Sequence, residues 1–384
     1  MKVVCWHPVL TDHQSHTWEA LQRAGAADLQ IFTLEQEHAD RQAQGWVNRH
    51  AASMATVLIP VQGWLAFILR QLRRNSDAVH LFGSPFERPR LMLALLAALC
   101  MGRKVWLVSE PYSPISSGYQ NDKLPLLGKI KAALRPLVYK AYGAVLKQRV
   151  AGVLGISPLA VSQYASIGVA PEKIHPFGYF VPRTVPVEVL PAATDAGPLR
   201  LIFVGTLIAR KGIDVLLEAI ARLRKEGVVV NLDLYGPGDS AHFQQDGNGV
   251  RYCGTIPFGE AQRVIAQYDL LVLPSRYDGW GVVVNEALLA GVPVICSDAV
   301  GAAAVLRKWQ CGQVFGSGDA AALAAVLRAL ALPGADRDKA VLRERARRAG
   351  DALDPLLAGH YLFQILSNPR DGCTTQPECP WYDI

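Results

Sequence analysis

Two carboxylates around a glycine-rich loop form the pattern in this chain that points most directly to chemistry. Asp278 and Glu286 are separated by seven residues and bracket the glycine-aromatic-glycine loop 279–281. An apolar run, Leu270 to Leu273, precedes the loop and a helical pattern follows it, so free N–H groups and a helix dipole there favour an anion. An anion does not need carboxylates for charge, so we expect Asp278 and Glu286 to accept hydrogen bonds from hydroxyl groups. Phosphate plus hydroxyls indicates a nucleotide or a sugar phosphate. The alternative for Glu286 is a first-turn acid that only complements the helix dipole.

A second segment has the composition of a phosphate cradle. The apolar run Leu201 to Val204 ends at Gly205, and Arg210 and Lys211 follow just before a helical pattern that begins at Ile213. Glycine and two adjacent cations between a strand and a helix suit a diphosphate. Taken alone, the two cations could equally be an ordinary surface pair.

The elements that must position these residues alternate between strand and helix in both halves of the chain. This alternation predicts an α/β fold with two Rossmann-like, doubly wound parallel sheets, and 384 residues suit two domains. A proline-rich segment without periodicity separates the halves. We therefore expect an N-terminal domain over 1–181, a linker over 182–198, a C-terminal domain over 199–350, and a C-terminal helix and tail over 351–384. The glycine-bounded segment 312–318 is expected to form turns.

Polar residues also follow the strand-like run Val105 to Val108 in the first half. Glu110 and Tyr112 come directly after it, and ligands of open parallel sheets bind at such carboxyl ends. Glu110 could instead cap the following turn. Three histidines, His7, His13 and His16, belong to the first expected strand and helix, where each is a candidate substrate contact or a surface or capping residue.

The positive charge of the protein is concentrated in its first half. Residues 1–181 carry 19 Lys and Arg against 11 Asp and Glu, whereas the net charge of the whole chain is +6. Lys123 to Arg149 holds seven basic residues and no acid, with apolar residues at helical spacing. Such a basic amphipathic helix suits an anionic membrane surface, although a core helix with a solvated basic face has the same pattern. A nucleic-acid partner is not expected, because no aromatic stacking pattern or recognised motif accompanies the charge.

Composition limits the class of protein. A hydrophobic content of 51% excludes general disorder, and no apolar run reaches the roughly 18 residues of a membrane span. The N-terminus reads as a strand rather than a signal peptide. Most of the seven cysteines lie in apolar segments and are expected to be reduced core thiols, which indicates a cytoplasmic protein. Cys373 and Cys379 lie in a polar tail where a disulfide or a metal site is the alternative.

The two motifs together resemble the signature of family-4 retaining glycosyltransferases of the GT-B fold. That family has two glutamates separated by seven residues around a glycine-aromatic-glycine loop, and an upstream phosphate-binding turn whose lysine matches Lys211. This chain departs from the pattern in four places. Asp278 replaces the first glutamate, Thr206 stands where arginine is common, Glu110 stands where a histidine is common, and the first loop lacks a glycine pair.

The resemblance implies roles for particular residues. The catalytic set comprises Asp278, Glu286, Lys211, Arg210 and Glu110. Acceptor contacts are assigned to His7, His13, His16 and Tyr112, and no metal ligand is expected. Donor contacts are assigned to Gly205, Thr206, Gly236, Ile256, Pro257, Tyr277, Gly279, Trp280, Gly281 and Val282.

The resemblance also implies an activity. We expect transfer of a hexose with retention from a nucleotide-sugar, UDP- or GDP-hexose, without metal or another cofactor. The basic first half indicates a lipid-linked saccharide acceptor at the inner face of a bacterial plasma membrane, in capsule, exopolysaccharide or O-antigen assembly. Two other functions stay open: a different GT-B enzyme such as a nucleotide-sugar epimerase, and a non-catalytic nucleotide-sugar-binding subunit.

Overall fold

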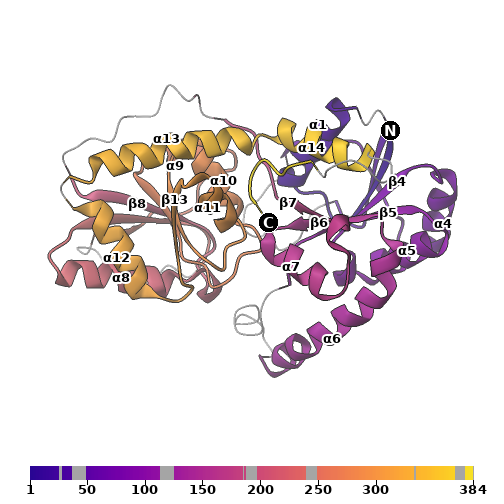
Figure 1. The fold of residues 1–384 in the computed structure, drawn as a ribbon, viewed down its shortest axis with the longest axis horizontal. Coiled ribbons are helices and arrows are strands. Elements are labelled where there is room, and N and C mark those ends of the chain that lie inside the picture. Colours follow the sequence, from indigo (N-terminus) through magenta and orange to yellow (C-terminus); the bar gives the residue numbers. More distant parts are fainter. Residues whose placement is uncertain are drawn as a thin grey trace.

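The protein consists of two α/β units, each built on one parallel sheet (Figure 1). The computed structural model describes residues 1–25, 28–36, 49–112, 125–184, 186, 197–238, 249–332, 334–367 and 377–383. Most of the predicted linker, with Lys123 and Cys373, lies outside these residues. Within them, the predicted fold of two doubly wound parallel sheets is confirmed.

The first sheet holds seven strands in the order β3-β2-β1-β4-β5-β6-β7. Every pairing is parallel, with β1 in register between β2 and β4. The order reverses at β1 and β4, so the loops after these two strands diverge and leave space at the carboxyl edge. The strands are β1 (Lys2–His7), β2 (Asp28–Thr33), β3 (Thr56–Leu58), β4 (Val79–Gly83), β5 (Lys104–Ser109), β6 (Gly152–Ile156) and β7 (Ile174–Phe177).

The second sheet holds six strands in the order β10-β9-β8-β11-β12-β13. Its order reverses between β8 and β11, and both strands lead directly into the predicted phosphate-binding segments. The strands are β8 (Leu199–Val204), β9 (Val230–Tyr235), β10 (Val250–Tyr252), β11 (Leu270–Leu273), β12 (Val294–Ser297) and β13 (Gly312–Phe315).

One part of the second sheet differs from the sequence prediction. The segment expected to form turns from residue 312 is the edge strand β13, parallel to β12. A Cβ on Gly312 would lie 1.8 Å from the carbonyl oxygen of Val294, so glycine is needed there for close pairing with the neighbouring strand. The glycine that indicated a turn is a requirement of strand packing.

Helices cover both sheets. In the first unit these are α1 (Asp12–Arg23), α3 (Arg49–Ser53), α4 (Trp64–Arg74), α5 (Pro89–Cys100), α6 (Pro125–Arg149) and α7 (Pro158–Ser166). In the second they are α8 (Ile213–Lys225), α9 (Ala261–Ile265), α10 (Val282–Leu289), α11 (Ala303–Trp309), α12 (Ala320–Ala331) and α13 (Asp336–Ala352). Short 3-10 turns lie at Pro85–Glu87, Pro171–Lys173 and Ala209–Lys211.

The chain returns to the first unit at its end. After α13, which runs along the second unit, helix α14 (Pro355–Ser367) packs beside α1 (Figure 1). The segment 377–383 then lies between the units, where Trp381 and Tyr382 are fully buried. The Tyr382 hydroxyl donates to the carbonyl oxygen of Gly155 at 3.1 Å, and Lys308 of the second unit pairs with Asp383 at 2.9 Å. The tail therefore joins the two units through one continuous buried core.

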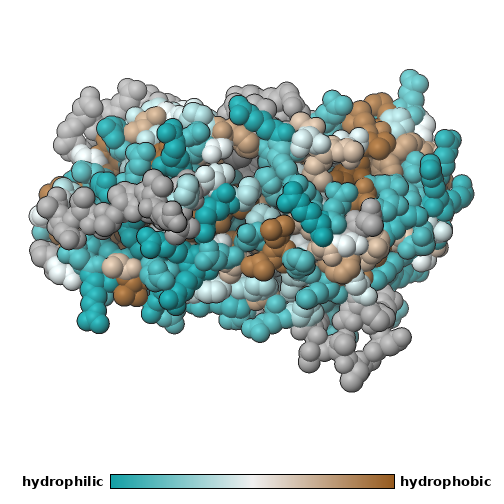
Figure 2. Space-filling view, turned by 90° about the horizontal axis from the view of Figure 1, so that it is seen from above, coloured by the Kyte–Doolittle hydropathy of each residue, from teal (hydrophilic) through white to brown (hydrophobic). Residues whose placement is uncertain are grey.

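The surface is mostly hydrophilic. On the face shown in Figure 2, apolar residues gather mainly toward the end of the molecule that the first unit forms. No helix in the described part of the chain is both long enough and apolar enough to cross a bilayer.

Candidate active site

The predicted phosphate-binding turn and the carboxylate loop meet at the carboxyl edge of the second sheet. Lys211 Nζ lies 2.5 Å from Asp278 Oδ2, and each side chain is about one-seventh exposed, 15% and 14% respectively. Arg210 Nη1 donates to the carbonyl oxygen of Tyr277 at 2.8 Å. Two segments that are far apart in sequence therefore contact each other, the cationic residues 210–211 and the loop residues 277–278.

Glycines allow the backbones at this edge to approach closely. Gly236 has φ +144°, and a Cβ there would lie 1.9 Å from the carbonyl oxygen of Gly205. The Gly236 N–H donates to the carbonyl oxygen of Gly254 at 2.8 Å, which brings the loop carrying Ile256 and Pro257 to the same edge. Thr206 is half-buried beside this contact. The sequence-predicted donor residues of three separate loops are therefore neighbours.

Helix α10 begins directly at the glycine loop. Gly281, its N-cap, has φ +90°, and a Cβ there would lie 3.0 Å from Val300 Cγ1, so the turn favours glycine. Val282 is the first helical residue and is half-buried. The N-terminus of α10 accordingly opens at the loop that follows β11.

Glu286 lies on α10, half-buried. Burial raises the pKa of its carboxyl group to about 7, because the charged form loses solvation. No hydrogen bond or ion pair to its side chain occurs among the residues that the structure describes. A carboxylate held in this way gains most from a ligand that donates hydrogen bonds to it.

Glu110 brings the first unit to the same loop. Its Oε1 accepts a hydrogen bond from the Tyr179 hydroxyl, and its Oε2 lies 2.7 Å from the position that a Cβ of Gly279 would take. The Tyr277 hydroxyl donates to the carbonyl oxygen of Pro111, next to Glu110. Burial raises the pKa of Tyr277, so this phenol stays protonated. The two units therefore face each other across residues 110–111 and 277–279.

Trp280 has a different environment from the rest of the glycine loop. Its side chain is 2% exposed and packs against Gly178, where a Cβ would lie 2.7 Å from the ring. Its Nε1 donates to Asn285 Oδ1 at 2.8 Å, and Asn285 Nδ2 donates to the carbonyl oxygen of Tyr179 at 2.6 Å. The Trp280 side chain, predicted to contact the donor, thus anchors the loop in the junction between the units.

Sequence reasoning did not select Asn285 or Tyr179. Asn285 is fully buried in an apolar helix, and a single amide in such a helix is the signal that could have identified it. Tyr179 carries no comparable signal in the sequence, since its role depends on the position of Glu110 in space.

The four predicted acceptor residues are not brought together. His7 is fully buried against Trp18, and burial lowers its pKa to about 4. His13 packs edge-on against Tyr179, with ring centroids 4.4 Å apart, while His16 stacks on His50. The Tyr112 backbone pairs with the side chain of Gln163 at 3.0 Å. His13 contacts the Glu110–Tyr179 pair through the Tyr179 ring.

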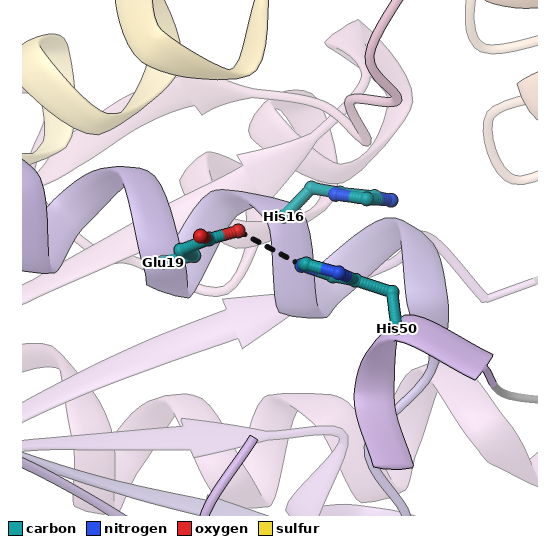
Figure 3. Close-up of side chains that lie close together, drawn as sticks. All are labelled: His16, Glu19 and His50. Carbon is teal, nitrogen blue, oxygen red and sulfur yellow. Dashed lines mark ion pairs between the residues drawn. The ribbon is translucent and has the colours of Figure 1, made fainter. Parts of the chain in front are cut away.

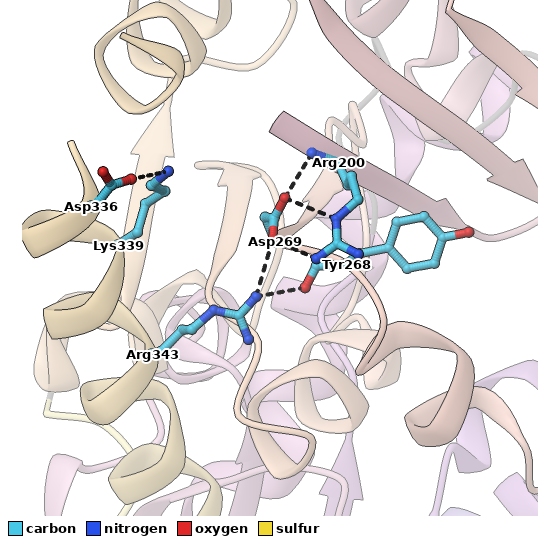
Figure 4. A network of polar contacts seen from close by, with 6 residues as sticks. All are labelled: Arg200, Tyr268, Asp269, Asp336, Lys339 and Arg343. Carbon is cyan, nitrogen blue, oxygen red and sulfur yellow. Dashed lines mark hydrogen bonds and ion pairs between the residues drawn. The ribbon is translucent and has the colours of Figure 1, made fainter. Parts of the chain in front are cut away.

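A partly buried ionic network supports the second sheet at its other edge (Figure 4). Asp269, just before β11, accepts hydrogen bonds from Arg200 Nη2 at 3.0 Å and Arg343 Nη2 at 3.3 Å. Although burial opposes ionisation, the hydrogen bonds from Arg200 lower the pKa of Asp269. Arg343 also donates to the carbonyl oxygen of Tyr268 at 2.9 Å. The network ties α13 to β8 and β11 and so fixes the strands that lead into the site.

The second unit is similar to a known family. Residues 198–332 match the family model described as glycosyl transferases group 1. The chain is 32% identical over 163 residues to the amylovoran biosynthesis glycosyltransferase AmsK of Erwinia amylovora, covering 39% of this chain and 40% of that protein. It is 32% identical over 181 residues to the phosphatidyl-myo-inositol mannosyltransferase of Mycobacterium leprae, covering 44% and 47% respectively. The matched segments thus span less than half of these relatives.

The whole fold also has solved counterparts. The structure of HepE from Anabaena in complex with UDP and glucose superposes with a TM-score of 0.66 at 12% identity, covering 96% of this chain and 100% of that one. The arrangement is the GT-B fold of glycosyltransferases, as the resemblance implied.

Proposed function

We propose that the protein is a metal-independent retaining glycosyltransferase that transfers a hexose from a nucleotide-sugar to a lipid-linked saccharide. The observation that carries the proposal is the contact between Lys211 and Asp278 at the carboxyl edge of a domain that matches the group 1 glycosyl transferase model, with Glu286 on the helix that begins at the same loop. The structural neighbour solved with UDP and glucose supports a nucleotide-sugar donor, and we propose UDP- or GDP-hexose.

The contacts indicate how a donor would change the site. Lys211 is paired with Asp278. A diphosphate is a stronger partner for this cation, since it offers several anionic oxygens. Binding then shifts Lys211 to the phosphate and releases the Asp278 carboxylate to accept hydrogen bonds from sugar hydroxyls.

Transfer requires stabilisation of the leaving phosphate. Negative charge grows there as the bond to the anomeric carbon breaks, and Lys211, Arg210 and the N–H groups at the start of α10 stabilise it. Glu286 accepts hydrogen bonds from the ribose hydroxyls. Glu110, held by Tyr179 against Gly279, contacts the sugar from the first unit.

The donor assignment is tested by a thermal-shift panel of UDP, GDP, ADP and their hexose conjugates on wild type and Lys211→Ala. We expect one nucleotide to raise the Tm of wild type only. With an acceptor extract, NMR of the product should show the anomeric configuration of the donor. Binding without transfer or hydrolysis would favour the non-catalytic subunit, and isomerisation of the free nucleotide-sugar would favour an epimerase.

The proposed acceptor and the proposed membrane location are argued from helix α6. Leu134 and Leu137 on this helix are 52% and 63% exposed, and the basic residues Lys140 and Lys147 are exposed on it as well. Apolar side chains among cations suit the surface of an anionic bilayer. A relative named for mannosyl transfer to phosphatidyl-myo-inositol and another named for amylovoran biosynthesis support a lipid-linked acceptor in bacterial surface polysaccharide assembly, at the inner face of the plasma membrane.

Vesicle flotation tests this assignment. Wild type should float with vesicles containing anionic lipid, and Leu134→Gln combined with Leu137→Gln should reduce the bound fraction. Leu356→Gln is the matched control, because Leu356 is 45% exposed on α14. Equal flotation of the α6 variant and the control would reject α6 as the contact surface.

A further inference from the structure

Three potential metal ligands lie together outside the candidate donor site (Figure 3). His16 and Glu19 are three residues apart on α1 and therefore share one face of the helix. His50 approaches from α3, and its Nε2 lies 3.0 Å from Glu19 Oε2. One ligand atom from each residue falls within 4.8 Å of the other two.

We propose that His16, Glu19 and His50 bind a divalent transition-metal ion, with Zn²⁺ as the best-fitting class. Two imidazole nitrogens and one carboxylate oxygen form a ligand set that zinc accepts, and they leave one coordination position for water. Calcium and magnesium fit poorly, because they prefer oxygen ligands alone. The site shares no residue with the 210–211 and 277–286 segments.

The two imidazole rings lie face to face. Their centroids are 3.9 Å apart and their planes differ by 13°. A neutral imidazole has one ring nitrogen with a free lone pair, which is the form that binds a metal ion.

Glu19 is oriented by a second contact. Its Oε1 accepts a hydrogen bond from Arg23 Nη2 at 2.6 Å, which leaves Oε2 directed at His50. Such a partner fixes the direction of a ligand, although its positive charge also weakens the attraction between the carboxylate and a cation. We therefore expect binding of intermediate strength.

The backbone around the three residues is already in place for binding, whereas one side chain must turn. Asp12 Oδ1 accepts a hydrogen bond from the Ala51 N–H at 2.8 Å, so α3 is attached to α1. The lone pair of an imidazole nitrogen lies in the plane of its ring, and the two stacked ring planes are nearly parallel, so one imidazole must rotate for both nitrogens to face one ion. The ion would strengthen the attachment of α3 to the first unit.

Isothermal titration with ZnCl₂ on the reduced full chain is the first test. We expect one site per chain, and at least about a tenfold loss of affinity in His50→Ala and in Glu19→Gln, because each removes a direct ligand. His360→Ala is the matched control, since His360 is an exposed histidine on α14 that is not one of the three clustered residues. It should bind zinc as wild type does.

Co²⁺ substitution identifies the ligands. Nitrogen and oxygen ligation gives visible d–d bands without a thiolate charge-transfer band, and these bands should disappear in His16→Ala. A thiolate band would assign the binding to cysteine, such as the exposed Cys100, and would overturn the proposal. Equal zinc affinity in wild type, His50→Ala and Glu19→Gln, or no binding by wild type, would overturn it as well.

Discussion

The carboxyl edges of the two sheets are organised differently. At the second sheet, Lys211, Asp278 and Arg210 contact one another or each other's loops, and glycines bring the backbones together. At the first sheet, the predicted contacts disperse: His7 is buried against Trp18, and His16 turns to His50. The glycines and charges of the second edge each follow the end of a strand, so a local sequence pattern predicts them, whereas contacts among side chains at the first edge depend on tertiary structure.

The junction between the units combines the two kinds of organisation. Trp280 belongs to the glycine loop of the second unit, yet its side chain packs against Gly178 and lies near Tyr382. Asn285 links the same tryptophan to the Tyr179 backbone. The glycine loop 279–281 is thereby held by the segment that also carries Tyr179, the hydrogen-bond partner of Glu110.

The largest effect should come from breaking this junction. Trp280→Ala removes a fully buried ring and should lower the free energy of unfolding by about 3–5 kcal/mol. Urea unfolding followed by circular dichroism measures the loss. Trp309→Ala is the control, because Trp309 is only half-buried and its loss should be smaller. Equal losses in the free energy of unfolding for the two variants would show that the junction contributes no more to stability than the site of Trp309.

The next largest effect is on activity and comes from the carboxyl edge of the second sheet. Lys211→Ala should reduce transfer or donor hydrolysis by about 100- to 1000-fold, because it removes the charge that we propose stabilises the leaving phosphate. Arg222→Ala, at an exposed ion pair with Glu218, should leave the rate unchanged. A Lys211 variant that keeps more than about a tenth of the activity would contradict a catalytic role for the second edge.

Measuring stability at two pH values tests whether the pKa of the Glu286 carboxyl group is raised in the folded protein. Its pKa is about 7 in the folded protein and 4.5 ordinarily, so the folded protein keeps a proton that the unfolded chain loses between these values. The free energy of unfolding therefore falls as pH rises through this window, and one pKa unit corresponds to about 1.4 kcal/mol.

Glu286→Gln removes the ionisation while keeping the shape. The variant should be more stable than wild type by about 2–3 kcal/mol at pH 8 and equally stable at pH 4, where the acid is protonated in both states. Urea unfolding at the two pH values measures the difference. The Asp214→Asn control carries the opposite shift, since Arg276 lowers the pKa of Asp214, and it should not gain stability at pH 8. A Glu286→Gln variant without a gain at pH 8 would mean that the carboxyl group is solvated.

The sequence predicted the two parallel sheets and which residues lie at the carboxyl edge of the second sheet, because both depend on local patterns. Alternating apolar runs locate strands, and a glycine or a cation next to a strand end marks a loop that faces a ligand. The burial of Trp280 was not predictable in this way, because the partners of its ring lie in residues 178 and 382. The His16–Glu19–His50 cluster was missed for the same reason, since α3 meets α1 only in the folded chain.

The smallest effect should come from the first edge. His13 contacts Tyr179, which holds Glu110, so it lies at the side of the site where an acceptor would approach. His13→Ala should raise the KM for the acceptor by about three- to tenfold, the range of one lost hydrogen bond. The thermal shift induced by the nucleotide alone, without its sugar, should stay as in wild type, because the proposed nucleotide contacts belong to the second sheet and Glu110 is proposed to contact only the sugar. Steady-state kinetics with the acceptor varied separate these effects, with His360→Ala as the control. A weaker nucleotide shift in His13→Ala would mean that the two edges form one binding site, since a residue of the first sheet would then contribute to the donor's free energy of binding.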